Sequence, residues 1–509
     1  MVLHCVTLFL AVYIHTSTWL CVFGERVDVR HAELFSVSYS ADETVKIVTY
    51  NYSSTQKDVY ILYSRGSSLS DLHLPIGTKV KYIEIPIRSA AVMDTTSLAF
   101  FEVLGAADKV AAYVPGNANA TESSLAAAVL TSPCWQLRNQ KGQMDDFDHA
   151  QDNPATFDVF FVRLWNSPEE FGNNSVLVGS IAESTPLKRS EWIKFFALFL
   201  GKEAEANRLF SEIEERYNCL KRIALKAKSM QPAYQKNIVW FDQFGLDFYP
   251  TSSKYLLAFI EDAGGHYQPN CTNSCGRVHS NRLAEMLKYA DVVVTTGIES
   301  RTVDRFFSSL VKSGISHQLL RNLLAAGSPA MTSQAIYNVD KRLGVGGGID
   351  WMEAAIIEPD VVLLDLIKIL YPDFLQYCHH SMSQYQTTFL RNIVRDKTTT
   401  FLSEHCNSSN VRPLLGSSLQ PCQCSGCNKR FVSLGFVKQR RCTSIRKIRT
   451  AVCIGSCTSN SSPARCEPGD HLKRYVKATC RHSINSVRKR IGWVGFDFVK
   501  TCNCIGESV

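Results

Sequence analysis

Residues 189–228 read RSEWIKFFALFLGKEAEANRLFSEIEERYNCLKRIALKAK, and this stretch decides how the main part of the chain is organised. Its apolar residues recur every three or four positions, and neither a proline nor a cluster of turn residues interrupts it. The pattern predicts one long helix. The segments on either side of it indicate what this helix connects.

Short apolar strands alternate with helical patterns on both sides of the predicted helix. This alternation is typical of an α/β architecture. Two α/β halves joined by one long helix predict two lobes with a nearly rigid cleft between them. The expected strands cover residues 90–93, 108–114, 157–162, 174–179, 237–241, 291–297 and 359–365, and the expected helices cover 97–105, capped at Asp94, and 253–260.

Four stretches of this α/β region carry a family resemblance: TTSLAFFEVLGAADKVAAY (95–113), ESTPLKRSEWIKFFALFLGKEAEANRLFSEIEERY (183–217), LAEMLKYADVVVTTG (283–297) and GGIDWMEAAIIEPDVVLLDLIKILYP (347–372). They resemble the helical-backbone class of periplasmic substrate-binding proteins, which serve ferric siderophore, haem and cobalamin importers. The resemblance implies a two-lobed substrate-binding-protein fold over 25–392, with an N-lobe at about 75–185, a connecting helix at about 189–228 and a C-lobe at about 235–392. It also implies a small ligand held between the lobes, such as a metal chelate.

Candidate ligand groups in the first half follow predicted strands, where ligands gather in open α/β sheets. Thr95 and Thr96 open a helix and could offer hydroxyl and backbone N–H groups to an anion; plain helix capping is the alternative. Arg163 and Trp165 could pair a carboxylate and stack a planar group. A salt bridge between the lobes, or simple packing, explains this pair equally well.

The second half supplies four further candidates. Tyr249, Ser252 and Lys254 lie in the loop and helix start after a predicted strand, where a phenol or an amine could meet a metal chelate. Trp351 follows the glycine-rich turn at 346–348 and could cover a ligand. Packing of Tyr249 and a hinge or tight turn at the glycines are the alternatives.

Enzymatic activity is not expected from this sequence. It contains no G-x-S-x-G elbow, no H-E-x-x-H and no G-x-x-x-x-G-K-[ST] motif. Paired acidic residues such as Glu169 and Glu170 are typical of solvated surface charge. We therefore expect a binding protein without catalytic residues, cofactor, metal site or nucleic-acid partner.

The N-terminal 24 residues are apolar and almost uncharged, which predicts a secretory signal peptide; an uncleaved signal anchor is the alternative. No later stretch reaches the roughly 18 apolar residues that a membrane span needs. We expect a secreted, extracellular glycoprotein. Its N-x-[ST] sequons begin at Asn51, Asn119, Asn173, Asn270, Asn407 and Asn460.

Cysteine content and charge both change near residue 421. Ten of the 18 cysteines lie between Cys422 and Cys504, a density typical of a small disulfide-stabilised module in an oxidising compartment. From residue 421 onward 17 Lys and Arg face four acidic residues, whereas the preceding part is mildly acidic. Residues 393–421, rich in Ser, Thr, Asn and Pro, are predicted to be a linker.

The C-terminal module, 422–509, resembles the cystine-knot family and in particular its sclerostin and DAN branch. The resemblance rests on CNKRFVSLGFVKQRRCTSIRKIRTAVCIGSC, ARCEPGD, YVKATC and FDFVKTCNC. It implies an all-β domain with two long hairpins at 430–452 and 473–501. The implied disulfides are Cys427–Cys466, Cys453–Cys502, Cys457–Cys504 and Cys442–Cys480. A zinc site at Cys422, Cys424 and Cys427 is the alternative. Cys422 and Cys424 could also pair with each other, with Cys406 or between two chains, and the pairing of Cys134, Cys219, Cys271, Cys275, Cys378, Cys406, Cys422 and Cys424 stays open.

These observations lead to three functional hypotheses. In the first, the large domain captures a small ligand, such as a ferric siderophore or haem, while the knot forms a homodimer or attaches the protein to a partner or to the matrix. In the second, the knot antagonises or mimics a cystine-knot growth factor. In the third, the chain is a structural component of the extracellular matrix. The basic residues of the knot suit glycosaminoglycan or an acidic protein, and a solvated, charged strand face is the alternative.

Overall fold

The computed structural model divides into two units, which are described separately. The first comprises residues up to 372 together with 385–418, and the second comprises 373–384 and 419–509. The structure describes residues 26–40, 44–51, 57–67, 69, 79–113, 132, 135, 154–166, 168–230, 236–245, 247–269, 276–344, 346–372, 384–402 and 414–418, and in the second unit 428–435, 438–439, 442–444, 448–454, 456–459, 462–468, 471–481, 489–499 and 502–505.

The first lobe contains a parallel sheet of four strands in the order β6-β5-β7-β8. Its strands are β5 (Ala90–Val92), β6 (Val110–Tyr113), β7 (Val159–Arg163) and β8 (Ser175–Val178). Helix α1 (Thr95–Val103) connects β5 to β6, and the backbone turns at Gly105, whose φ is 60°. The four predicted strands and the predicted helix of this half are confirmed.

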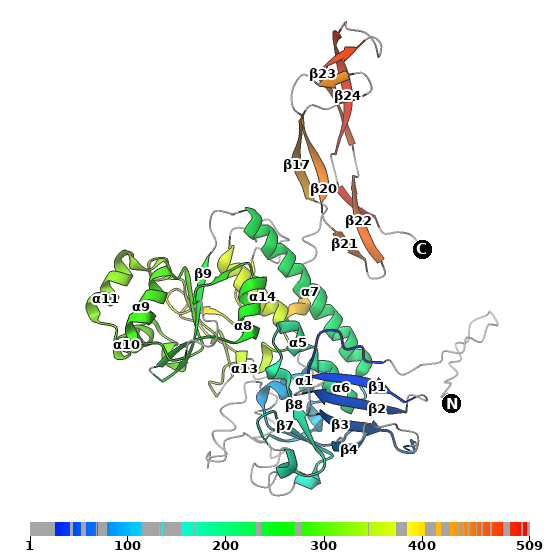
Figure 1. Ribbon diagram of the computed structural model, residues 1–509, viewed down its shortest axis with the longest axis vertical. Coiled ribbons are helices and arrows are strands. Elements are labelled where there is room, and N and C mark those ends of the chain that lie inside the picture. The colour runs from blue at the N-terminus through cyan, green and yellow to red at the C-terminus, as the bar shows by residue number, and fades with distance from the viewer. Residues whose placement is uncertain are drawn as a thin grey trace, which may run out of the picture. The chain divides into compact units, whose positions relative to one another are not determined.

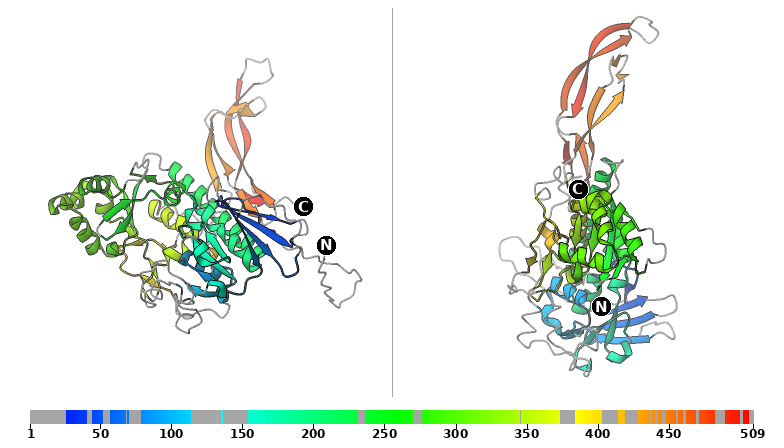
Figure 2. Two further views of the ribbon diagram at one scale, coloured as in Figure 1. Left: turned by 60° about the horizontal axis from the view of Figure 1, so that its bottom comes forward. Right: turned by 90° about the vertical axis from the view of Figure 1, so that its left-hand side faces the viewer.

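The second lobe is built on β9 (Asn237–Phe244), β12 (Val292–Thr295) and β13 (Ile336–Asn338), which run parallel. The short strands β10 (Asp247–Pro250), β11 (His266–Tyr267) and β15 (Arg391–Asn392) extend this sheet. Helices α9 (Ser280–Tyr289), α10 (Val303–Lys312) and α11 (His317–Asn322) lie together on the side of β9 remote from α7 (Glu203–Met230) (Figure 1, Figure 2). The predicted strands at 237–241 and 291–297 are confirmed, and the predicted helix at 253–260 is α8 (Lys254–Asp262).

The long helix predicted over 189–228 is wrong in its extent. The segment forms α5 (Pro186–Ser190), α6 (Trp192–Leu200) and α7, and only α7 is long. Gly201 ends α6 in the left-handed conformation, with φ at 67°, and its N–H donates to the carbonyl of Ala197. A glycine in this conformation is a common helix terminator, because it has no Cβ to clash.

The strand predicted at 359–365 is also wrong, because these residues form helix α14 (Pro359–Leu370). Pro359 occupies the first turn, where its missing N–H costs no hydrogen bond and its fixed φ suits a helix. All but one of the helix's residues are buried, so apolar residues occupy most positions of its sequence and a helical periodicity is hard to recognise. Helix α14 packs along α7 (Figure 1).

A third sheet in the first unit was not predicted. Its strands β1 (Phe35–Tyr39), β2 (Val45–Asn51), β3 (Lys57–Tyr63) and β4 (Lys79–Glu84) lie in that order. Phe35 packs edge-on against Trp192 and Phe195 of α6, with ring centroids 5.0 and 5.3 Å apart. Strands β1, β2 and β3 precede residue 75, the predicted start of the N-lobe.

The segment predicted as a linker, 393–421, belongs partly to the first unit. Strand β16 (Thr400–Phe401) pairs with β14 (Arg342–Leu343), and the 3₁₀ segment η8 (Leu415–Ser418) packs against α7 and α14. The N–H of Leu415 donates to the Glu358 carboxylate at the start of α14. The described parts of this segment, 393–402 and 414–418, therefore contribute to the first unit.

Two antiparallel ribbons dominate the second unit: β17 (Asn428–Gly435) with β20 (Ile448–Ile454), and β23 (His471–Arg481) with β24 (Lys489–Val499). The shorter strands are β18 (Lys438–Gln439), β19 (Cys442–Ser444), β21 (Ser456–Ser459), β22 (Ser462–Pro468) and β25 (Cys502–Ile505). Pairing of β19 with β23 sets Cys442 opposite Cys480, and pairing of β22 with β25 sets Cys466 opposite Cys504.

Three further observations bear on the cellular setting. Cys219 in α7 is disulfide-bonded, as in proteins that fold in oxidising compartments. In the described part of the chain, no helix combines the length and apolar character required to cross a membrane. Of the sequon asparagines, Asn173 is exposed and Asn51 is half-buried, while Asn119, Asn270, Asn407 and Asn460 lie outside the described residues.

Asp365 in α14 provides a pH-dependent test of this fold. Its buried carboxylate accepts the backbone N–H groups of Thr388, Phe389 and Leu390 at 2.7–2.9 Å and the Tyr385 hydroxyl at 2.5 Å. Burial raises its pKa to about 6 from the ordinary 3.8. Protonation in that window therefore favours the folded state, and this contribution is lost as the pH rises through about 6.

We expect the free energy of unfolding of the wild type to gain up to about 3 kcal/mol relative to Asp365→Asn as the pH falls from 7 to 4. Denaturant unfolding of both proteins at several pH values measures this difference. A difference that stays constant with pH would contradict the expectation.

Candidate ligand-binding site at the ends of the strands

The carboxyl end of β5 leads directly into α1, and Asp94 is the N-cap residue of this helix. Its carboxylate accepts the Ser97 N–H at 2.7 Å and the Ser97 hydroxyl at 2.8 Å, and it also accepts the Thr96 hydroxyl. Thr95 and Thr96 are half-buried. Because the Thr96 hydroxyl is directed to a carboxylate, the structure favours helix capping over the predicted anion contact at this position.

Arg163 and Trp165 stand at the carboxyl end of β7, as predicted. The Arg163 Nε donates to the carbonyl of Met93 at 3.0 Å, across from β5, and the guanidinium lies 5.8 Å from the Trp165 ring centroid. The Trp165 ring is 63% exposed, whereas Arg163 is half-buried. The pair therefore presents a positioned cation beside an accessible aromatic surface.

Tyr113, at the carboxyl end of β6, joins this group. Burial raises the pKa of Tyr113 well above its ordinary value, the Asp94 charge raises it further, and the Arg163 charge opposes both. Glu353 on α13 (Trp351–Ala354) also acts on Tyr113. Since Glu353 belongs to the second half of the chain and α13 packs against α1, the two halves of the first unit meet at this edge.

Trp351 packs inward at the start of α13. Its ring lies 5.7 Å from that of Trp240 in β9 and 5.9 Å from that of Phe389, and only 8% of the residue is exposed. The structure therefore uses this ring to anchor α13 to the second lobe. The alternative reading of the glycine-rich segment as a tight turn fits, because Gly347 has φ at 82° and its N–H donates to Gly344.

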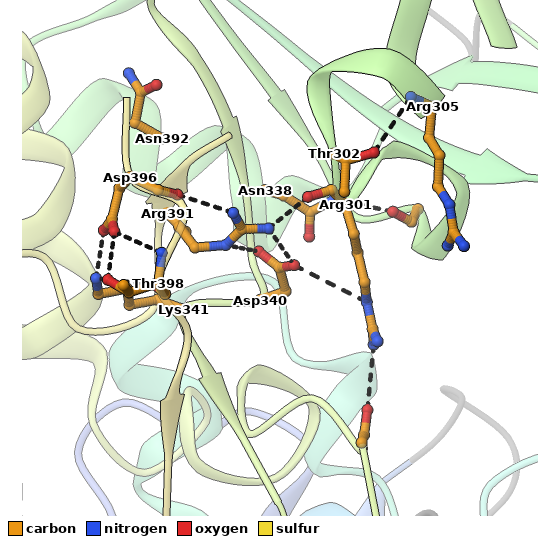
Figure 3. Close-up of polar contacts among 12 residues, drawn as sticks. Arg301, Thr302, Arg305, Asn338, Asp340, Lys341, Arg391, Asn392, Asp396 and Thr398 are labelled. Atoms are coloured by element: carbon orange, nitrogen blue, oxygen red, sulfur yellow. Dashed lines mark hydrogen bonds and ion pairs between the residues drawn. The ribbon is translucent and has the colours of Figure 1, made fainter. Parts of the chain in front are cut away.

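At the carboxyl edge of the second sheet, Asp340 and Arg391 form a buried bidentate ion pair (Figure 3). Nε of Arg391 donates to Oδ1 of Asp340 at 2.9 Å, and Nη2 donates to Oδ2 at 2.7 Å. Arg391 also donates to the carbonyl of Asp396 at 2.9 Å and to that of Arg301 at 2.5 Å. The pair thereby fixes the backbone from which the Arg301 side chain projects.

The Arg301 guanidinium extends from this network toward the glycine-rich turn (Figure 3). Its Nη2 donates to the carbonyl of Gly347 at 3.3 Å, and its Nε lies 4.0 Å from Asp340. Burial lowers the pKa of Arg301, and the Asp340 charge opposes that effect. Within the described residues its Nε has no hydrogen-bond partner, and neither has the Oδ1 of the buried Asn338.

Three residues predicted for the second lobe lie on other segments than this network, on β10 and near the start of α8. Tyr249 lies in β10 opposite Asp242, and its ring packs edge-on against Phe244 at 5.8 Å. Ser252 and Lys254 are exposed near the start of α8. The Tyr249 ring therefore packs against a neighbouring side chain, which was the alternative to ligand binding for this residue.

Exposed apolar side chains accompany the polar groups at both edges. Phe244 ends β9, Ile298 follows β12, and Met352 lies on α13, next to Glu353. Together with Trp165 they are among the most exposed large apolar residues of the described chain. A ligand contacting these edges would meet both cationic and apolar surface.

Five residues at these strand ends were not predicted from the sequence: Tyr113, Arg301, Asn338, Asp340 and Arg391. Arg301 had a usable signal, because it follows the predicted strand at 291–297 just as Arg163 follows its strand. Arg391 had no such signal. It lies in a strand of only two residues, and its partner Asp340 is 51 positions earlier in the sequence. Among the described residues, no group of three His, Cys, Asp or Glu is placed to hold a metal ion.

Comparisons with known proteins place these observations in context. No family model matches the chain. An uncharacterised lipoprotein of Methanocaldococcus jannaschii is 27% identical over 210 residues, which cover 40% of this chain and 44% of the relative, so the chain spans less than half of that relative.

Solved structures similar to the chain include several binding proteins. A periplasmic solute-binding protein of Veillonella parvula has a TM-score of 0.43 at 13% identity, covering 69% of this chain and 88% of its own. A periplasmic heme-binding protein of Pseudomonas aeruginosa has a TM-score of 0.40 at 13% identity, with 62% and 99% covered. FhuD2 of Staphylococcus aureus, with bound ferrioxamine B, has a TM-score of 0.37 at 17% identity, with 56% and 99% covered.

The Asp340–Arg391 pair predicts a stability difference between two similar substitutions. Asp340→Asn leaves the buried Arg391 guanidinium without its countercharge, and we expect a loss of about 3–5 kcal/mol in the free energy of unfolding. Asp396→Asn removes a partly exposed partner of Lys341 and should cost about 1 kcal/mol or less. Denaturant unfolding compares them; equal losses would contradict a structural role for the buried pair.

Proposed function

We propose that the first unit is a non-enzymatic binding domain for a small organic anion, such as a metal chelate, held where the strand ends of the two lobes meet. The Arg301 guanidinium is the observation that carries this proposal. Asp340, whose carboxylate lies 4.0 Å from the Arg301 Nε, is already paired with Arg391 through two hydrogen bonds. The Arg301 charge therefore remains available to a ligand, with a buried Nε donor that lacks a partner among the described residues.

The first lobe offers a second set of contacts to the same ligand. Arg163 supplies a cation positioned by the Met93 carbonyl, and Trp165 supplies an exposed ring beside it. Tyr113 is held neutral by its raised pKa, so its hydroxyl would serve as a hydrogen-bond donor near neutral pH. Sites of this composition, mainly apolar with a few convergent polar groups, suit small organic ligands.

Continuity between the two sets supports one site rather than two. Arg301 contacts the carbonyl of Gly347, and a short stretch of chain leads from Gly347 into α13. Glu353 of α13 acts on Tyr113, next to Arg163. The glycine-rich turn and α13 thus connect the cation of the second lobe to that of the first.

For the second unit, we propose a cystine knot that serves dimerisation or attachment to a partner or to matrix polysaccharide. The register that sets Cys442 opposite Cys480 supports the predicted bridge between those two cysteines. The net charge of +13 from residue 421 onward suits an acidic or sulfated partner. The disulfide at Cys219 supports an exported location for the whole chain.

Ligand binding by the secreted protein tests the first proposal. Native mass spectrometry detects ligand carried through purification, and calorimetry with haem, ferrioxamine B and cobalamin measures affinity. We expect Arg301→Gln and Arg163→Gln each to weaken binding about tenfold to a hundredfold, because each removes a charge-assisted contact. Arg305→Gln is the matched control, since Arg305 is exposed on α10.

Two results would contradict this proposal. The first is a mass without bound ligand together with no heat from any compound in the panel. The second is equal affinity of all three arginine variants, which would move the site away from these strand ends.

Disulfide mapping by peptide mass spectrometry tests the knot. We expect cross-linked peptides that join Cys442 to Cys480, Cys453 to Cys502, Cys457 to Cys504 and Cys427 to Cys466. A bridge between Cys466 and Cys504, which face each other across β22 and β25, would contradict the proposed knot.

A further inference from the structure

Strand β1 is an edge strand whose sequence is almost the same in both directions. It lies at one end of the sheet β1-β2-β3-β4. Its sequence, Phe-Ser-Val-Ser-Tyr, has an aromatic residue at each end, a serine next to each aromatic residue, and Val37 at the centre. When such a strand meets an identical antiparallel strand, residues of the same kind face each other.

The hydrogen bonds of the β1–β2 hairpin show which backbone groups point outward. Residues of an antiparallel strand bond their neighbour alternately, and those in between direct their N–H and C=O groups to the opposite side. The Asn51 N–H donates to Leu34 at 2.7 Å and the Ser40 N–H donates to Val45 at 2.9 Å, so the even-numbered residues bond β2. The N–H and C=O groups of Phe35 and Val37 therefore point away from β2.

The two edges of this sheet differ in charge. Strand β4, at the far edge, carries Lys79, Lys81 and Glu84, and charged residues on an edge strand discourage pairing with other strands. Strand β1 carries no charged residue. Charge therefore protects the β4 edge of this sheet but not the β1 edge. Residues 26–27 contact the end of β1, where the Val27 N–H donates to the Tyr39 hydroxyl at 2.8 Å and Arg26 lies over the Tyr39 ring.

Strand β1 is also firmly held before any partner arrives. The Glu183 carboxylate accepts the N–H groups of Glu33 and Leu34 at 2.9 Å each, immediately before the strand. Phe35 is packed against α6, as described above. An edge that is fixed in advance loses little conformational entropy when it pairs.

We propose that β1 is a self-association edge at which two copies of the chain pair antiparallel about a two-fold axis through Val37. The two Val37 residues exchange their outward backbone hydrogen bonds. Phe35 lies opposite Tyr39 of the second copy, and Ser36 lies opposite Ser38. Aromatic pairs and serine pairs of this kind stabilise antiparallel ribbons, and a two-fold axis gives the self-complementary interface that is common in homodimers.

This surface lies in the first unit and goes beyond the proposed function, because it requires neither a ligand nor the second unit. Ser36 and Ser38 are exposed, so both can be replaced without disturbing the core. In the proposed register, Ser36→Lys with Ser38→Lys places like charges opposite each other. Ser36→Lys with Ser38→Glu places opposite charges there and serves as the matched control.

Sedimentation velocity of the full-length chain over a range of concentrations measures the association, and hydrogen exchange of residues 34–40 locates it. We expect the wild type to dimerise reversibly, with residues 34–40 exchanging more slowly at high concentration. The double-lysine variant should dimerise at least about tenfold more weakly, and the lysine–glutamate variant should retain or exceed the wild-type affinity.

Three results would overturn the proposal. One is equal affinity of the two double variants, which would exclude the register. Another is association without any change in exchange at residues 34–40, which would place the contact elsewhere. The third is the absence of concentration-dependent association.

Discussion

Packing of α14 along α7 is the contact on which the first unit depends. Arg216 on α7 and the buried Asp360 at the start of α14 form an ion pair within this contact. Burial raises the pKa of Asp360, and the Arg216 charge opposes that rise. A Cβ on Gly416 would lie 2.3 Å from the Asp360 carboxylate, so this glycine allows the backbone of η8 to approach the pair closely. The start of α14, the middle of α7 and a segment 56 residues after Asp360 are thus fixed at one point.

Other buried carboxylates connect distant segments in the same way. Glu191 accepts the backbone N–H groups of Arg30, His31 and Ala32, and Lys194 neutralises its charge at 2.7 Å. Asp365 binds three successive N–H groups after residue 387. An ionised group is costly to bury unless it is paired or hydrogen-bonded. Because each carboxylate requires donors from one particular segment, these contacts specify the path of irregular backbone that has no strand or helix to direct it.

Sequence reasoning succeeded where local patterns were sufficient. The four strands of the first parallel sheet, strands β9 and β12 of the second and the cap of α1 at Asp94 follow from alternation and from the N-cap rule, whereas β13 was not predicted. It failed where tertiary burial hides periodicity, as in α14, whose apolar run suits a strand and a buried helix equally well. It also failed at Gly201, because a single glycine within a helical pattern can either be tolerated or end the helix, and only the backbone conformation decides between them.

Only the part of the candidate site in the first lobe could be predicted from the sequence. Arg163 and Trp165 lie at the end of an apolar strand, and the rule that ligands gather at strand ends is sufficient to find them. Arg301 obeys the same rule, but its role depends on whether the nearby Asp340 carboxylate is already paired. Arg391 pairs with Asp340 although the two residues are 51 positions apart, because its strand β15 pairs with β13. The charge that Arg301 would offer to a ligand is thus set by long-range pairing. The sequence shows which side chains follow strands, and only the folded chain decides which of their charges stay uncompensated.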